Sequence, residues 1–156
     1  MTRLKDIEST YGSDTIFILG KGPSADKIPP EVYAGSLVIG INDAERIYPA
    51  DISIFHAEWV TRALTETGPR ARLYLSSIPF PAAADRTVRA PHASLSQESS
   101  DLMVQRLLLD DIVIEDVLFM TALQVAHAVA ELRGRPQTVY MVGFDFQPDL
   151  GSAQAL

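Results

Sequence analysis

The stretch Thr15-Ile-Phe-Ile-Leu-Gly-Lys-Gly-Pro-Ser24 indicates how this chain begins its fold. Its first five residues are rich in β-branched and aromatic types, which is typical of a buried strand in a parallel sheet. Gly20 and Gly22 predict a tight turn in which a ligand can approach the main chain closely. Ser24 can cap a following helix, whose first N–H groups favour an anion. We therefore predict a strand–glycine loop–helix unit with a phosphate site, with a plain turn as the alternative.

Length and composition favour a single globular domain with a core of its own. The chain has 156 residues, of which 47% are hydrophobic and 21% are charged. A net charge of −7 without a run of Lys or Arg disfavours a nucleic-acid polymer or an anionic membrane surface as partner. The sequence has no cysteine, which excludes disulfides, thiolate metal sites and a cysteine nucleophile. The N-terminal residues do not resemble a signal peptide and no apolar run is long enough for a bilayer, so we expect a cytoplasmic protein.

Short apolar runs alternate with helical patterns along the chain. The expected strands cover residues 15–19, 36–41, 52–55, 72–76 and 138–142. Helices are expected over 58–67 and over 119–133, the second of them deeply buried. A further helix over 97–109 and a short edge strand or turn within 110–116 complete the pattern. This alternation predicts an α/β, Rossmann-like fold with a mainly parallel sheet flanked by helices.

The segment from residue 78 to residue 100 contains three prolines and shows little periodicity. We predict a long loop there, which is a lid, a binding loop or a mobile segment.

Polar or glycine residues follow every expected strand. Ligands of parallel sheets bind beyond the carboxyl ends of the strands, and those ends share one edge of the sheet. The residues at these ends are 20–24, Asn42, Asp43, His56, Ser76, Ser77 and 143–145. Their common edge is the predicted site.

The same residues resemble a known enzyme family. Gly20-Lys-Gly-Pro-Ser24, Asn42, Met120-Thr-Ala122 and Val139-Tyr-Met-Val-Gly-Phe-Asp-Phe146 are similar to motifs of the bacterial sialyltransferases that use CMP-sialic acid, and of related sialyltransferase-like glycosyltransferases. The resemblance extends from residue 15 to residue 147. It implies that a sialic acid-like sugar is transferred from a CMP-sugar donor to a glycan acceptor, without a cofactor or a metal. It also implies a peripheral association with membrane-bound glycan assembly.

The resemblance assigns nucleotide contacts to the residues that match the family motifs. These are Gly20, Lys21, Gly22, Pro23, Ser24, Asn42, Thr121, Gly143, Phe144 and Asp145. The glycine loop and Asn42 would hold the nucleotide phosphate and sugar, and Thr121 would donate to a phosphate or carboxylate. The segment ending at Asp145 would close on the ribose or the base.

The chain departs from the family pattern at several positions. Lys21 replaces an Asn, Ala122 replaces a Gly, and Gln147 stands where a Tyr is expected. The family's catalytic His lies beyond the Gly-x-Asp strand, whereas this chain ends at Leu156, which favours a truncated enzyme. Two alternatives therefore stay open: a nucleotide-binding or interaction domain without turnover, and a pterin pyrophosphokinase-like enzyme with a carboxylate-bound metal beside Asp145.

His56 is the only histidine at an expected strand end, and it is our candidate catalytic base. A histidine suits the deprotonation of an acceptor hydroxyl near neutral pH. Asp43 and Glu58 are alternative bases, although turn and helix-start roles suit them better. His127 is expected in the core and His92 in solvent.

Two further side chains receive structural interpretations. Trp59 is expected in a helix core rather than as a sugar platform. Arg133 is expected to end its helix in solvent, where a cation complements the carboxyl end of the helix.

Overall fold

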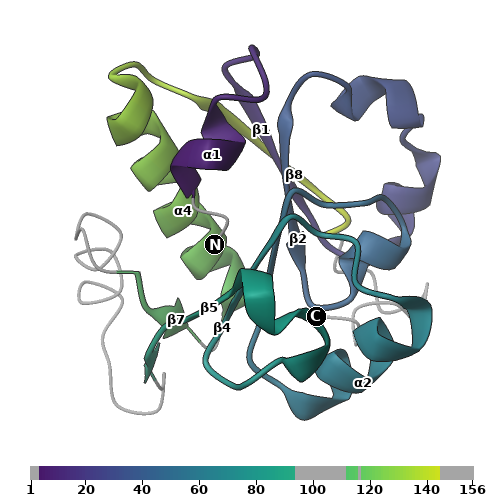
Figure 1. The fold of residues 1–156 in the computed structure, drawn as a ribbon. Coiled ribbons are helices and arrows are strands. Elements are labelled where there is room, and N and C mark those ends of the chain that lie inside the picture. Colours follow the sequence, from purple (N-terminus) through teal and green to yellow (C-terminus); the bar gives the residue numbers. More distant parts are fainter. Residues whose placement is uncertain (1–3, 94–111, 116, 145–156) are drawn as a thin grey trace.

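The computed structural model describes residues 4–93, 112–115 and 117–144. A six-stranded sheet forms its centre, in the order β5-β4-β3-β2-β1-β8, and every neighbouring pair of strands is parallel (Figure 1). The strands are β1 (Thr15–Leu19), β2 (Leu37–Ile41), β3 (Ile52–Phe55), β4 (Leu73–Ser76), β5 (Thr87–Arg89) and β8 (Thr138–Val142). The predicted Rossmann-like α/β fold with a mainly parallel sheet is confirmed.

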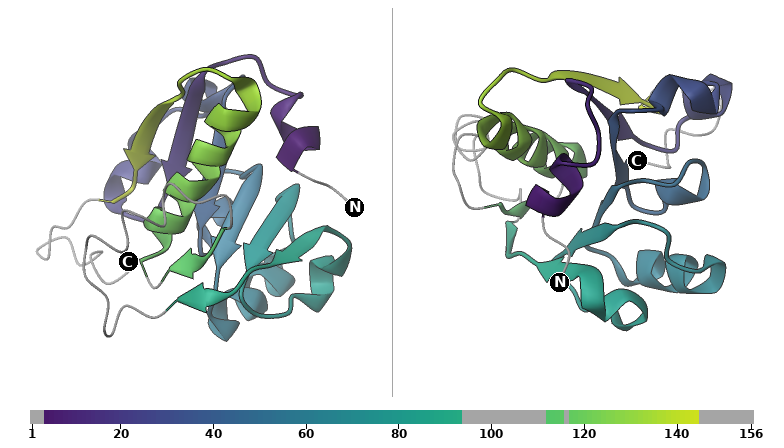
Figure 2. Two further views of the ribbon diagram at one scale, coloured as in Figure 1. Left: turned by 90° about the vertical axis from the view of Figure 1, so that its left-hand side faces the viewer. Right: turned by 45° about the horizontal axis from the view of Figure 1, so that its top comes forward.

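Helices cover both faces of the sheet. The α-helices are α1 (Leu4–Glu8), α2 (Glu58–Thr67) and α4 (Leu118–Arg133). The 3₁₀ helices are η1 (Pro23–Lys27), η2 (Pro30–Tyr33), η3 (Ala44–Arg46) and η4 (Pro81–Arg86). Figure 2 shows α1 and α4 together on one face, with α2 and the 3₁₀ segments on the other. Two short strands, β6 (His92–Ala93) and β7 (Ile114–Glu115), form a separate parallel pair.

Strand side chains alternate between two buried layers. Ile16 and Ile18 of β1 pack in the core under α4, whereas Phe17 and Leu19 pack in the core under the 3₁₀ helices. All four side chains are buried. A strand covered on both faces needs apolar residues at every position, which is why the run was recognisable in the sequence.

The segment predicted as a long loop is partly regular. Its first half forms η4 and then β5, which pairs with β4 through Leu75 and Val88. The loop prediction is therefore wrong for these residues. A three-residue edge strand is too short to show an alternating pattern, and pairing with β4 rather than local sequence defines it. The expected helix over 97–109 lies outside the described residues.

Helix α4 begins one residue before its expected start and ends at Arg133 as expected. The φ of 68° at the following Gly134 allows the left-handed turn that closes the helix. The apolar side chains of α4 are buried only where the helix faces the sheet, as the exposed Leu132 shows. Of the two alternatives for 110–116, a short edge strand or a turn, the described residues show a strand, β7, which pairs with β6 and not with the main sheet.

Arg133 is not in solvent, and the expectation for it is wrong. Its side chain is 2% exposed, and its guanidinium donates to the backbone oxygens of Glu8, Tyr11 and Ser13 at 3.2, 2.7 and 2.6 Å. It also pairs with the carboxylate of Glu8 at 2.8 Å and lies 4.2 Å from the ring of Tyr11. The N-terminal segment folds over the end of α4 and buries this cation, a contact across more than a hundred residues.

None of the helices in the described part of the chain combines the length and the apolarity that a membrane crossing requires.

Candidate functional site

The glycine loop lies at the point where the order of the strands reverses. The chain proceeds outward from β1 to β5 and then returns to place β8 on the other side of β1. Ligands of open parallel sheets bind beyond such a reversal, at the carboxyl ends of the strands. The loops after β1 and β8 are therefore where a ligand is expected first.

The two loops at this reversal are packed directly on one another. Gly20 N donates to Val142 O at 2.7 Å, and Gly22 N donates to Gly143 O at 2.6 Å. A Cβ atom on Gly20 would lie 2.8 Å from Gly143 O, and one on Gly143 would lie 2.5 Å from Gly20 O. Gly143 also has a φ of 80°. Contact between the two loops thus explains why both positions are glycine, and a ligand close to the main chain is not needed to explain it.

The helix expected after the glycine loop is a five-residue 3₁₀ helix, and the prediction of a Ser24 cap is wrong. The residue at the cap position is Gly22, and no side chain in the described ranges caps the helix. Ser24 instead accepts a hydrogen bond from Gly143 N at 3.1 Å. Pro23 starts the helix and two further prolines follow soon after it, so the segment cannot extend into an α-helix. The anion-attracting end of a long helix is therefore missing from this loop.

A group of three charged residues stands at the same edge, beyond β1 and β2. Asp43 has a side chain only 3% exposed, and its Oδ1 lies 2.8 Å from Lys21 Nζ. Its Oδ2 lies 3.3 Å from Arg46 Nη1. The Lys21 contact is an ion pair rather than a directed hydrogen bond, because among the described residues Oδ1 has no donor with hydrogen-bond geometry. Two cations share one buried carboxylate, so the group carries a net charge of +1.

Trp59 lies on the surface beside this group, and the expectation of a core position is wrong. The residue is 44% exposed, and Lys21 Nζ lies 5.6 Å from the centroid of its ring. The hydrophobic side of α2 is formed by Val60 and Leu64, which leaves Trp59 on the outer side of the helix. An exposed indole next to a cation can pack against a sugar or a base.

Asn42 directly follows β2 with a φ of 56°. In the part of the chain that the structure describes, it is the one residue other than glycine with a positive φ. Asparagine tolerates this left-handed conformation better than most residues do. Its backbone N–H donates to Ile54 O at 2.9 Å, which ties the turn to β3. The turn thereby presents Asn42 beside the buried Asp43.

His56 follows β3 and is partly exposed. Its ring stacks on that of His92, with the ring centroids 4.9 Å apart and the planes 13° from parallel. His92 is exposed, as predicted. This stack brings β6 to the carboxyl end of β3, which no pattern in the sequence indicated.

His127 is not a core histidine, and that expectation is wrong. Its side chain is 37% exposed and its Nε2 lies 3.8 Å from a carboxylate oxygen of Glu131, on the outer side of α4. Glu58 is exposed in the first turn of α2, in agreement with a helix-start role.

Thr121 lies in α4 with its hydroxyl engaged inside the chain. The hydroxyl accepts from Glu115 N at 2.8 Å and donates to Val113 O at 3.0 Å, and the residue is fully buried. It holds β7 against α4. Phe144 packs over Gly20. Asp145 lies outside the described residues.

Lys21, Asn42, Asp43 and His56 thus share the carboxyl edge of three adjacent strands, as the pattern of strand ends indicated. Sequence reasoning missed Arg46 and the surface position of Trp59, although the spacing of Val60 and Leu64 within the helix could have placed Trp59 outside.

No group of three His, Asp or Glu side chains in the described ranges could hold a metal ion. No protein-family model, curated protein or solved structure matches the chain.

Proposed function

We propose that the carboxyl edge of the sheet binds the CMP part of a nucleotide sugar, and that the chain is a sialyltransferase-like glycosyltransferase. The observation that supports this proposal best is the group of Lys21, Asp43 and Arg46 beside the exposed Trp59. A single buried carboxylate orients two cations there, so that these three described side chains together carry one net positive charge. Such a site favours an anion with an attached ring.

The cations suit the leaving phosphate of a CMP-sugar. Transfer of the sugar leaves negative charge on the phosphate, and cations held in place before the reaction stabilise that charge. The contact with Asp43 holds Lys21 in position, so that little reorganisation is needed when the phosphate arrives. Lys21 stands where the family has an asparagine, so a charge replaces an amide contact in the loop.

Trp59 and Asn42 supply the remaining recognition. The exposed indole offers an apolar face for the sugar or the cytosine ring. The Asn42 amide both donates and accepts hydrogen bonds, as recognition of ribose or base requires. His56, at the end of the next strand, is the candidate base for the acceptor hydroxyl, with its ring orientation held by the stack on His92.

Calorimetric titration of CMP into the full chain tests the donor site, with UMP and AMP as comparison ligands. Replacement of Lys21 by alanine should weaken CMP binding about tenfold or more, because a hydrogen bond to a charged group contributes about 1.5–3 kcal/mol. Lys27→Ala is the matched control, since this lysine is exposed in η1 and should not affect binding. Asn42→Ala should weaken CMP binding as well.

The proposal fails if no nucleotide binds, or if Lys21→Ala and Lys27→Ala bind CMP equally well. Release of CMP from CMP-sialic acid in the presence of a glycan acceptor then tests turnover. The wild-type chain and His56→Ala could both bind CMP without releasing it from the CMP-sugar. That result would assign the chain to the alternative of a nucleotide-binding domain without catalysis.

A further inference from the structure

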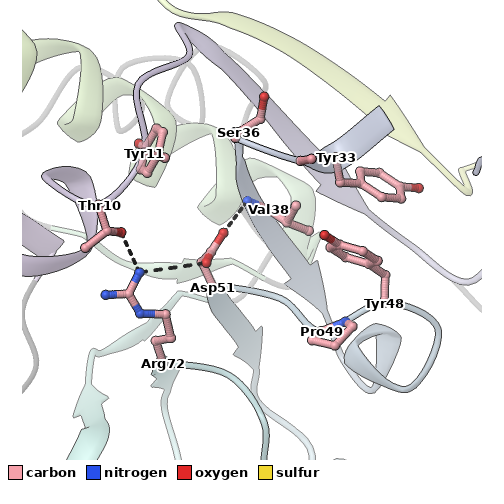
Figure 3. Close-up of a pocket in the computed structure, with 11 residues that line it drawn as sticks. Thr10, Tyr11, Tyr33, Ser36, Val38, Tyr48, Pro49, Asp51 and Arg72 are labelled. Atoms are coloured by element: carbon pink, nitrogen blue, oxygen red, sulfur yellow. Dashed lines mark hydrogen bonds and ion pairs between the residues drawn. The ribbon is translucent and has the colours of Figure 1, made fainter. Parts of the chain in front are cut away.

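A cavity of about 290 Å³ opens at the opposite, amino edge of the sheet. It lies where β2, β3 and β4 begin, under the segment that follows α1 (Figure 3). Its lining includes Thr10, Tyr11, Tyr48, Asp51 and Arg72. None of these residues belongs to the carboxyl edge described above, and strands of five residues separate the two edges by roughly 16 Å.

Asp51 provides an acceptor in this cavity. Its Oδ2 accepts from Val38 N at 2.9 Å, whereas its Oδ1 is 4.0 Å from Arg72 Nη1, which is too long for a hydrogen bond. Burial raises the pKa of this carboxyl, against the lowering effects of the Val38 N–H and of Arg72. The carboxylate is thus anchored through Oδ2, and in the part of the chain that the structure describes no hydrogen-bond donor lies close to Oδ1.

Donors stand next to this acceptor. Arg72 Nη1 donates to Thr10 Oγ1 at 2.6 Å, which holds the guanidinium at the rim of the cavity beside Asp51. In Figure 3 the hydroxyl of Tyr48 points toward the side of the cavity where Asp51 lies. Among the described residues, the lining contains one carboxylate and one guanidinium, whose charges sum to zero.

Two aromatic rings flank the polar groups, and both are held in place. Tyr11 lies on one side of Asp51 and Tyr48 on the other (Figure 3). The guanidinium of Arg133 lies 4.2 Å from the ring of Tyr11, and Tyr33 packs 4.5 Å from the ring of Tyr48, measured between centroids. Walls that do not rearrange reduce the entropy that a ligand must overcome.

We propose that this cavity binds a neutral polyhydroxylated ring, the size of one monosaccharide unit. A hydroxyl group both donates and accepts, so adjacent hydroxyls can donate to Asp51 and accept from Arg72 or Tyr48. The apolar C–H face of such a ring packs on a tyrosine ring. A charged ligand fits less well, because the carboxylate repels an anion and the guanidinium repels a cation. The volume is close to the lower limit of known small-molecule cavities, which suits one ring and not a chain.

Titration of the full, isotope-labelled chain with methyl α-glucoside, methyl β-galactoside and myo-inositol, followed by amide NMR, tests the proposal. At least one of these probes should give saturable shifts at the amides that line the cavity. Tyr48→Phe keeps the ring and removes the hydroxyl, and it should weaken binding about three- to tenfold, as expected for one lost hydrogen bond. Tyr140→Phe is the matched control, because Tyr140 is exposed on β8, away from the cavity, and should leave binding unchanged.

Three results would overturn the proposal. The first is the lack of saturable shifts at concentrations far above the millimolar range. The second is equal binding by Tyr48→Phe and the wild type. The third is saturation by n-butylammonium or acetate in place of the sugars, which would assign the cavity to a charged ligand. Failure of CMP binding leaves this test unaffected, because sugar shifts are measured without nucleotide and at the other edge of the sheet.

Discussion

Replacement of Arg133 by alanine should strongly destabilise the fold, although Arg133 lies far from both proposed sites. The substitution removes a buried cation that donates to the backbone oxygens of Glu8, Tyr11 and Ser13 and to the Glu8 carboxylate. Loss of one partner of a fully buried ion pair costs about 3–5 kcal/mol; here Glu8 is partly exposed, but several backbone oxygens lose a charged donor as well. The contacts share one side chain and are not additive, so we expect the free energy of unfolding to fall by about this amount, a large part of the 5–15 kcal/mol of a typical domain.

Urea unfolding followed by circular dichroism measures this loss, provided that the slope of the transition is compared between variants. Arg135→Ala is the matched control. Arg135 forms an ion pair of 2.7 Å with Asp14, which Arg133 also contacts, but Arg135 is exposed. Exposed pairs contribute little because solvent screens them, so this variant should unfold close to the wild type.

Arg133→Lys separates geometry from charge. Lysine keeps the positive charge but cannot reach several carbonyl oxygens at once with a planar group, so most of the stability should still be lost. If the unfolding free energy falls no further in Arg133→Ala than in Arg135→Ala, the reasoning is refuted, because the buried guanidinium would then not stabilise the fold.

The remaining predictions concern backbone packing, a buried hydroxyl and alkaline pH. Gly143→Ala should lower the unfolding free energy by more than the ~1–2 kcal/mol of a left-handed backbone, because its Cβ would meet Gly20 O; Gly134→Ala, with open space around it, should show only the conformational cost in the same urea assay. Tyr74→Phe should lower the unfolding free energy by about 1–3 kcal/mol, because the buried carboxylate of Glu45 loses the hydroxyl that donates to it at 2.5 Å. A urea midpoint equal to that of the wild type would contradict this. Burial raises the pKa of Tyr11 to about 12 from 10.0, so the unfolded chain ionises first. Stability is therefore full below pH 10 and decreases as the pH rises toward 12, and the decrease should be smaller in Tyr11→Phe when thermal unfolding is followed across that range.

The strands of the sheet were the part of the fold most accessible from the sequence. The expected bounds of β1, β3 and β8 coincide with the observed ones, and those of β2 and β4 differ by one residue at the start. Strands β1 to β4 are buried over nearly all of their length and mostly apolar, and such runs can be recognised along the chain. The shared edge of Lys21, Asn42 and His56 followed from the same reasoning, because parallel strands end together.

The positions of side chains that depend on distant partners could not be predicted from the sequence in the same way. Arg133 has the pattern of a helix-terminal cation in solvent, and only the N-terminal segment folded over it turns it into a buried anchor. His127 was assigned to the core because its helix is almost wholly apolar, and Trp59 because a tryptophan in a helix is more often a core residue. Which side of a helix faces the sheet depends on how the helix docks, and a helix rich in apolar residues leaves that choice open.

The sequence by itself determined the class of fold, the direction of the sheet and the polar character of its carboxyl edge, because apolar runs and glycine turns act on near neighbours in the chain. Only the tertiary structure decided that Gly20 and Gly143 pack against each other, and that Lys21 and Arg46 share the carboxylate of Asp43. It also decided that tyrosines from separate segments enclose a cavity at the amino edge. These features depend on contacts between residues far apart along the chain, and such contacts exist only after the strands have paired and the helices have docked.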